Sequence, residues 1–550
     1  MNLVNMLLRS CVGMVSRYAR ALLPTVTNSG RVALYSVYIN TRKEDQYSRR
    51  STEVVGETCS IVLPFALTRG RKIHTMSEDG EWWKKIEESP PFDELMLDSV
   101  VDVYTDSTEY SKVKPWQTLT EESWGGSGFA IAGKKILTNA HVVEPMNDHT
   151  SVHVKRLDSQ IKYKAKVKKI SHECDLAILE IDSDKFWEGM NPLELGDVPP
   201  LHEIVYVVGY PEAGDMICVA KGFVTGVDTT KYIQSSTKLL TIQIDGTINH
   251  GNSGGPVITG NKVLGIAFES TKCQKRIGTH GFVIPTPIIR HFIASAEESS
   301  QNAVFGSLVL SYQSLENDHI RNHFKMSPET TGTLINKINS SSGAHKILKK
   351  NDIILAIDGV PIGNDAKVPF QNEERISFNH LVSMKKPYEK ILIKVLRKGK
   401  EHEYNISLKP VRPHITVQQY YNLPSYYIFG GFVFVPLTKS YIDDLSYMCA
   451  CILHDEYKIT DEQHVIISQV MSDDINQGYG DFKDLRVKKV NGVKVKNFKH
   501  LCELIEGCCS ENLRMDLEND KVMVLNYESA KKATFEILER HNIKSAWAIY

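Results

Sequence analysis

The chain has 550 residues, the length of about three or four domains of roughly 150 residues each. Hydrophobic residues make up 42% and charged residues 24%, which argues against extensive disorder. The 65 Lys and Arg nearly balance the 66 Asp and Glu, so no overall positive field predicts a nucleic-acid partner. No run of 18 or more apolar residues occurs, so we expect no integral membrane segment. Ten scattered cysteines without a Cys-x-x-Cys pair argue against disulfides or zinc, and we expect no cofactor or metal.

The first 43 residues differ from the rest because they contain six Arg and Lys and no Asp or Glu. At about 100° per residue, one face of a predicted helix is apolar and consists of Val4, Leu8, Cys11, Val15, Tyr18 and Leu22. Arg9, Arg17 and Arg20 lie on the opposite face. This pattern is typical of a mitochondrial presequence, which we place at residues 1–40, and it predicts a mitochondrial matrix protein. A chloroplast transit peptide and a basic surface helix are the alternatives.

The residue pattern of the sequence changes near residue 99. Residues 41–98 are polar and charged and are interpreted as a linker. Residues 99–298 contain short β-type runs separated by Gly, Asn and Asp, such as Val100–Tyr104 and Ile204–Val208. Runs of this kind are typical of a sandwich or barrel. A helical stretch is expected from Ile288 to about Glu298.

A weak internal repeat follows in the C-terminal part of the chain. The segment Leu348–Gly359 recurs loosely as Phe482–Gly492. In both copies a strand leads into an Asp-Gly or Asn-Gly turn, then an apolar strand and an amphipathic helix. The expected helices lie near Phe378–Met384 and Phe498–Ile505. We therefore predict two similar α+β domains, at residues 302–412 and 420–550.

Three motifs in the β-rich region carry residue types suited to nucleophilic catalysis, and they contain His141, Asp175 and Ser253. A serine hydroxyl is a poor nucleophile at neutral pH and needs an adjacent imidazole to accept its proton. That imidazole needs a buried carboxylate, which fixes its tautomer and stabilises its protonated form. Each motif alone is ambiguous. Their order and spacing together predict a catalytic triad in a trypsin-like double barrel.

Glycines flank the predicted nucleophile in the segment Asn249–Val257. They allow a tight turn in which backbone N–H groups converge on a developing oxyanion. We assign this oxyanion hole to Gly251, Asn252 and Ser253, with the amides of Gly251 and Ser253 as the donors.

These motifs resemble the Do-like (Deg/HtrA) serine proteases, through T-N-A-H-V-V at His141, C-D-L-A-I-L at Asp175 and G-N-S-G-G-P at Ser253. The similarity runs from about residue 99 to the C-terminus. It is closest to the plant organellar and nuclear branch, which is marked by Phe186–Gly189, Val208–Pro211 and Gly281–Pro287. The resemblance implies a mostly β protein with a chymotrypsin-like double β-barrel followed by one or two PDZ domains. The two predicted C-terminal domains fit that plan.

The resemblance also implies an activity, namely ATP-independent endoproteolysis of unfolded or damaged proteins by a homotrimer or a multiple of trimers. PDZ domains would add the capture of peptide segments. In trypsin-like folds the residue six before the nucleophile lies at the base of the S1 pocket, and here it is the uncharged Thr247. The wall strand would be Ile266, Ala267 and Phe268, which favours a medium-sized apolar P1 residue over Lys or Arg.

Several positions depart from the family pattern. His250 precedes the oxyanion glycine where relatives carry a small residue, and it is either a harmless exposed side chain or a group that crowds the substrate. Glu212 and Ala213 replace an apolar residue and glycine. Val309 occupies a glycine position in the first PDZ-like carboxylate loop, which could spoil its row of N–H donors. Gly430–Phe434 is interpreted as an intact second loop or as a strand-turn packed into an assembly interface. These departures motivate a rival hypothesis, a proteolytically weak chaperone or scaffold that binds unfolded chains.

Overall fold

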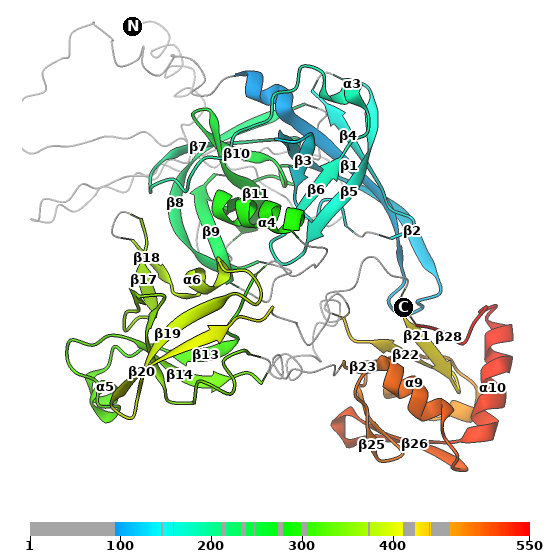
Figure 1. Ribbon diagram of the computed structural model, residues 1–550. Helices are drawn as coiled ribbons and strands as arrows, with labels where there is room; N and C mark the ends of the chain where they lie inside the picture. The colour runs from blue at the N-terminus through cyan, green and yellow to red at the C-terminus, as the bar shows by residue number, and fades with distance from the viewer. Residues whose placement is uncertain are drawn as a thin grey trace, which may run out of the picture. The chain divides into compact units, whose positions relative to one another are not determined.

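The computed structural model of the protein (Figure 1) describes residues 94–144, 147–157, 159–211, 216–232, 238–246, 248–272, 279–298, 305–340, 342–371, 374–410, 424–438, 441 and 463–549. The predicted presequence, residues 1–40, and nearly all of the predicted linker, residues 41–98, lie outside the described residues. A short 3-10 helix, η1 (Glu94–Ser99), begins the described chain.

Six antiparallel strands close into a first barrel in the order β1-β2-β3-β6-β5-β4. They are β1 (Val100–Tyr110), β2 (Thr118–Ile131), β3 (Lys135–Thr138), β4 (Ser151–Arg156), β5 (Lys162–Ser171) and β6 (Leu176–Glu180). Valine side chains fill the interior at alternate positions: Val152 and Val154 on β4 are buried between half-buried neighbours. The strands β3 and β6 are direct neighbours, so the residues that follow β3 and precede β6 lie close together.

A second barrel has the strand order β10-β11-β12-β9-β8-β7. Its strands are β7 (Ile204–Gly209), β8 (Cys218–Lys231), β9 (Lys238–Asp245), β10 (Pro256–Thr259), β11 (Lys262–Lys272) and β12 (Thr279–Pro285). A short helix, α3 (Asp184–Trp187), lies between the barrels in sequence, and α4 (Thr286–Glu298) follows them where the sequence predicts a helix. The pair of barrels confirms the predicted chymotrypsin-like architecture.

The first C-terminal domain is a small sheet in the order β13-β14-β15-β19-β20, so that β13 is an edge strand. Its elements are β13 (Leu310–Gln313), α5 (Asp318–His323), β14 (Thr333–Ile338), β15 (Ile353–Ile357), β16 (Val360–Pro361), β17 (Lys367–Pro369), β18 (Arg375–Ser377), α6 (Asn379–Ser383), β19 (Lys390–Arg397) and β20 (Lys400–Ser407). The predicted Asp-Gly turn joins β15 to β16, with φ of 48° at Asp358 and 80° at Gly359. Two left-handed residues give the turn type whose twist matches a two-residue hairpin.

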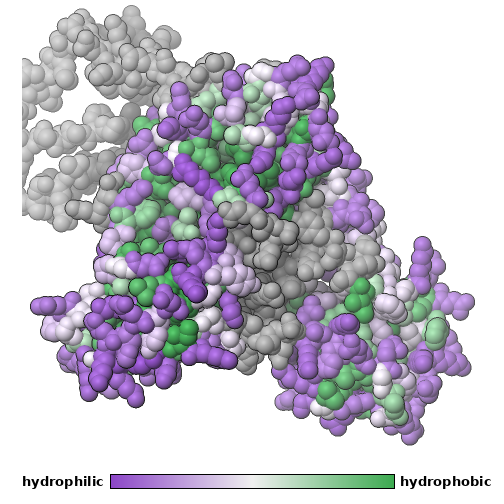
Figure 2. Space-filling view, in the orientation of Figure 1, coloured by the Kyte–Doolittle hydropathy of each residue, from purple (hydrophilic) through white to green (hydrophobic). Residues whose placement is uncertain are grey.

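The second C-terminal domain has two four-stranded sheets, β23-β22-β21-β28 and β25-β24-β26-β27. Its strands and helices are β21 (Tyr426–Phe429), β22 (Phe432–Pro436), β23 (Val465–Val470), η3 (Asp474–Asn476), η4 (Gly480–Phe482), β24 (Val487–Val490), β25 (Val493–Lys494), α9 (Phe498–Glu506), β26 (Asn512–Leu517), η5 (Glu518–Asp520), β27 (Val522–Asn526), α10 (Tyr527–Arg540) and β28 (Trp547–Ala548). The predicted Asn491–Gly492 turn is also left-handed at both residues, with φ of 45° and 79°. Hydrophilic side chains cover most of this domain's visible face (Figure 2). The α+β character of both repeat copies is confirmed.

The structure decides the local conformation of the Gly430–Phe434 segment. Gly430 and Gly431 form the two-residue connection of the β21–β22 hairpin, where Phe429 pairs with Phe432. The N–H of Gly430 donates to Thr534 Oγ1 at 2.8 Å, and the N–H of Met471 donates to the Gly431 carbonyl at 2.7 Å. Strand β22 is paired on both sides, by β21 and β23. The segment is therefore a strand-turn, and its packing in an assembly interface stays a prediction.

Candidate active site

The loops after β3 and before β6 bring His141 and Asp175 into direct contact. The Nδ1 atom of His141 lies 2.7 Å from Oδ2 of Asp175. The backbone N–H of His141 donates to Oδ1 of the same carboxylate at 3.0 Å. The Asp175 side chain is 9% exposed, whereas that of His141 is 39% exposed. Because the ionised carboxylate only accepts, Nδ1 carries the proton and Nε2 is left as a proton acceptor.

The loop that carries Asp175 has an unusual backbone. Asp175 has a φ of 53°, a left-handed conformation that aspartate tolerates better than most residues. The buried side chain of Asn139 donates from Nδ2 to the Asp175 carbonyl at 2.8 Å. The neighbouring Cys174 is fully buried, and burial raises the pKa of its thiol. The cysteine therefore packs as a small apolar residue, while Asn139 holds the aspartate loop against the histidine loop.

Ser253 lies between β9 and β10 of the second barrel and is held by β2 of the first. The N–H of Ser127 donates to the Ser253 carbonyl at 2.8 Å. The Ser127 hydroxyl donates to the Gly251 carbonyl, also at 2.8 Å, and accepts from the N–H of Tyr210. A Cβ on Gly126 would lie 2.6 Å from the methyl groups of Val142 and 3.2 Å from the Ser253 carbonyl. The His141 turn and the Ser253 loop thus contact the same residue, at the junction of the barrels.

Gly254, which follows Ser253, has no room for a side chain. Gly254 has a φ of 86°, and an added Cβ would lie 2.0 Å from the Ser127 carbonyl oxygen and 2.4 Å from Thr138 Oγ1. Its N–H donates to the Ala267 carbonyl at 2.9 Å. Only glycine can combine a left-handed backbone with so close an approach to the Ser127 carbonyl. Gly254 therefore allows the Ser253 loop to pack closely against β2.

A tight turn precedes Ser253. The N–H of Asn252 donates to the Asn249 carbonyl at 3.0 Å, and Gly251 at the third position has a φ of 92°. His250 at the second position is not left-handed, so the turn is of type II. The N–H of Asn252, included in the predicted oxyanion set, closes this turn. Within the described residues no acceptor engages the N–H of Gly251 or Ser253.

Comparison with known proteins identifies the family. A trypsin-like peptidase model matches residues 126–266, and two PDZ models match residues 323–408 and 415–548. The chain is 74% identical to the mitochondrial Do-like protease 12 of Arabidopsis thaliana, over 99% of this chain and all of the relative. The chain belongs to the Do-like protease family.

A second relative agrees with this assignment. The mitochondrial Do-like protease 11 of Arabidopsis thaliana is 61% identical over 98% of this chain and 94% of its own length. Among solved structures, an HtrA-type protease AlgW bound to a decapeptide is 22% identical with a TM-score of 0.43, covering 58% of this chain and 97% of that one. This Do-like protease is therefore a serine endopeptidase with two PDZ domains, and it is mitochondrial.

The predicted specificity residues of this Do-like protease are mostly buried. Thr247 lies outside the described residues. Ile266 and Ala267 are fully buried, and Phe268 is 6% exposed, with its ring 4.8 Å from that of Tyr232. All three belong to one hydrophobic core cluster. The preference for an apolar P1 residue stays a prediction.

The departures noted in the sequence have different outcomes. His250 is exposed on the type II turn, and its effect on substrate stays open. Glu212 and Ala213 lie outside the described residues. Val309 has a φ of 42°, and its N–H donates to Ser307 Oγ at 3.2 Å. A β-branched residue thus adopts the left-handed backbone that anion-binding nests use, at a cost of about 1–2 kcal/mol.

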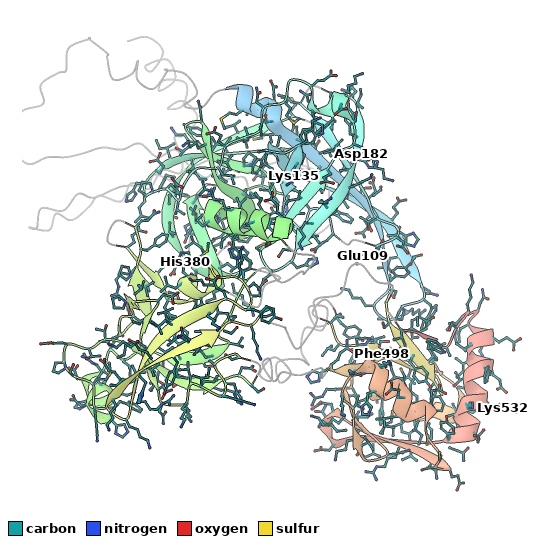
Figure 3. The ribbon with its side chains drawn as sticks, in the orientation of Figure 1. Glu109, Lys135, Asp182, His380, Phe498 and Lys532 are labelled. Carbon is teal, nitrogen blue, oxygen red and sulfur yellow. The ribbon has the colours of Figure 1, made fainter. Side chains whose placement is uncertain are left out.

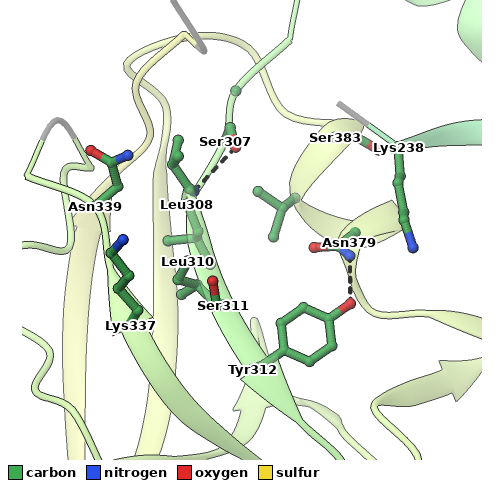
Figure 4. Close-up of a pocket in the computed structure, with 13 residues that line it drawn as sticks. Lys238, Ser307, Leu308, Leu310, Ser311, Tyr312, Lys337, Asn339, Asn379 and Ser383 are labelled. Atoms are coloured by element: carbon green, nitrogen blue, oxygen red, sulfur yellow. Dashed lines mark hydrogen bonds between the residues drawn. The ribbon is translucent and has the colours of Figure 1, made fainter. Parts of the chain in front are cut away.

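A groove of about 510 Å³ lies in the first PDZ domain beside Val309 (Figure 4). It runs between edge strand β13 and helix α6. The Asn379 side chain donates from Nδ2 to the Tyr312 hydroxyl at 2.8 Å across this groove. Tyr312 and Asn379 could not be identified from the sequence, because local sequence carries no signal that residues 67 positions apart meet.

The described residues offer no metal site, since they contain no cluster of three or more His, Cys, Asp or Glu side chains with suitable geometry. In the same part of the chain, no helix is both long and apolar enough to cross a membrane.

Proposed function

We propose that His141, Asp175 and Ser253 form the catalytic triad of a protease that degrades unfolded or damaged proteins without ATP. The observation that carries the proposal is the contact of both Asp175 oxygens with His141, one on Nδ1 and one on the backbone N–H. This arrangement fixes the imidazole in the tautomer that a general base needs.

The proposed reaction has two stages. Ser253 Oγ attacks the scissile carbonyl carbon while Nε2 of His141 accepts the hydroxyl proton. The N–H groups of Gly251 and Ser253 bind the oxyanion of the tetrahedral intermediate. His141 then gives its proton to the leaving amine, and an acyl-enzyme forms. A water molecule, deprotonated by His141, hydrolyses the acyl group and restores the enzyme.

The proposed substrates are extended segments of unfolded chains. A protease cleft binds its substrate in an extended conformation, which unfolded proteins adopt without energy from ATP. The edge strand β13 and the groove beside α6 support the capture of a peptide as an added strand.

Assembly as a homotrimer or a multiple of trimers and location in the matrix belong to the same proposal. Light scattering of the purified protein tests the subunit number.

The decisive experiment compares wild type with Ser253→Ala on a reduced, carboxymethylated protein and on its native form, with no ATP present. Ser123→Ala is the matched control. It also removes a serine hydroxyl, but the hydroxyl of Ser123 is exposed on the β1–β2 hairpin, where it donates to Asp106. We expect wild type and Ser123→Ala to fragment only the unfolded form, and Ser253→Ala to be inactive. Binding of the unfolded protein without any cleavage by wild type would favour the chaperone hypothesis.

A further inference from the structure

A second carboxylate–imidazole pair joins the same two loops as His141 and Asp175. Glu144 lies three residues after His141, and His172 lies three residues before Asp175. The Oε1 atom of Glu144 contacts Nδ1 of His172. The chemical roles are exchanged relative to the triad pair, since here the histidine loop supplies the carboxylate and the aspartate loop supplies the imidazole.

Because this second pair is largely buried, it strongly restricts movement of the two loops relative to each other. The Glu144 side chain is 6% exposed and that of His172 is 23% exposed. A carboxylate with so little access to water is costly to separate from its polar partners, and moving the two loops apart would remove the partner that the other loop supplies. The pair therefore opposes any movement of one loop away from the other.

The Val142 carbonyl of the histidine turn bonds to β1 and β2 instead of the aspartate loop. The Val142 carbonyl accepts from Thr105 Oγ1 at 2.7 Å and from Trp124 Nε1 at 3.0 Å. These bonds tie the turn to β1 and β2. They set its position on the barrel, whereas the Glu144–His172 contact joins it to the Asp175 loop, as the Asn139 bond to the Asp175 carbonyl also does.

We propose that Glu144 and His172 are positioning residues that hold the histidine and aspartate loops together during turnover. The inference rests on the proposed triad. The His141–Asp175 contact must survive while the imidazole gains and loses a proton, and Asp175 sits on a left-handed backbone that relaxation would relieve. A displacement of about 1 Å between such groups can lower a rate about 100-fold.

The test uses Glu144→Gln, His172→Gln and the double variant, with Asp102→Asn as the matched control. The Asp102 carboxylate is similarly buried, at 8% exposed, and lies 3.5 Å from Lys155 Nζ in the same barrel, where it joins β1 to β4. We expect Glu144→Gln and His172→Gln to lower kcat about 10- to 100-fold with KM within about twofold. The double variant is expected to lose no more than either single variant, because both remove one contact. Asp102→Asn is expected to keep its kcat.

A second readout is independent of catalysis. The backbone N–H of His141 is bonded to Asp175 Oδ1, so its hydrogen exchange reports separation of the two loops. We expect this amide to exchange at least tenfold faster in Glu144→Gln and His172→Gln, and unchanged in Asp102→Asn. Unchanged kcat and exchange in folded variants would overturn the proposal, as would an equal loss in Asp102→Asn. If wild type itself does not cleave, the proposed function fails, while the exchange rates still decide the role of this pair.

Discussion

Replacement of Gly254 by alanine tests how the Ser253 loop is held. Two separate costs apply at this position, a left-handed backbone with φ of 86° and a Cβ placed 2.0 Å from the Ser127 carbonyl oxygen. Two other glycines separate these costs. Gly260 has a φ of 51° with open space around it, and Gly255 is not left-handed but would place a Cβ 2.1 Å from the Val208 carbonyl oxygen.

The expected magnitudes follow from these distances. At Gly260 alanine costs about 1–2 kcal/mol of backbone strain, partly offset by about 0.4–1 kcal/mol from a less flexible unfolded chain. At Gly255 overpacking costs about 1–3 kcal/mol or more. Gly254→Ala has both costs, about 2–5 kcal/mol in total. For a domain of about 200 residues this lowers Tm by roughly 4–20 °C, against a few degrees for Gly260→Ala.

Calorimetry in the Ser253→Ala background measures these differences without self-digestion. Cleavage assays in the active background, well below each Tm, measure the effect on the site. We expect Gly254→Ala to lose nearly all activity and Gly260→Ala to keep it, because only the first moves the loop against β2. If Gly254→Ala is as stable and as active as Gly260→Ala, the close packing of this loop on Ser127 is wrong.

Two further predictions concern the first PDZ domain. Burial lowers the pKa of His380 on α6 to about 4 from 6.5 (Figure 3), so protonation favours the unfolded state. Stability is then fully present above about pH 6.5 and falls by up to about 3 kcal/mol as the pH drops to about 4; urea unfolding of His380→Gln should show a shallower pH slope, and an unaltered slope would contradict the assignment. Val309→Gly removes left-handed strain and should stabilise the domain by about 0.5–1 kcal/mol in urea unfolding, whereas a loss of more than about 1 kcal/mol would mean that the valine is unstrained there.

Local sequence signals were sufficient for the features that depend on local backbone chemistry. The turns at Asp358–Gly359 and Asn491–Gly492 were predictable because these pairs tolerate two left-handed residues in succession. The proposed triad could be suggested from residue types and their order because the chemistry admits few alternatives. The contact of Asp175 with His141 is the geometry that such a triad needs.

Features that depend on tertiary packing were not readable. Gly430–Gly431 is compatible with a ligand loop or a hairpin, and the pairing of β22 on both sides decides between them. The Glu144–His172 contact joins residues that are individually unremarkable in sequence, and it exists because β3 and β6 are neighbours. Specificity depends on loop conformation in the same way, which is why Phe268 could be placed on a strand but its burial could not be foreseen.

The central claim is that the His141–Asp175 pair activates Ser253. The most direct measurement is covalent labelling with a fluorophosphonate, which reacts with activated serines, followed by mass spectrometry of the peptides. We expect one adduct, on Ser253, with a labelling rate that rises as His141 loses its proton and falls by several orders of magnitude in Asp175→Asn. An adduct on another serine, or equal labelling of wild type and Asp175→Asn, would contradict it.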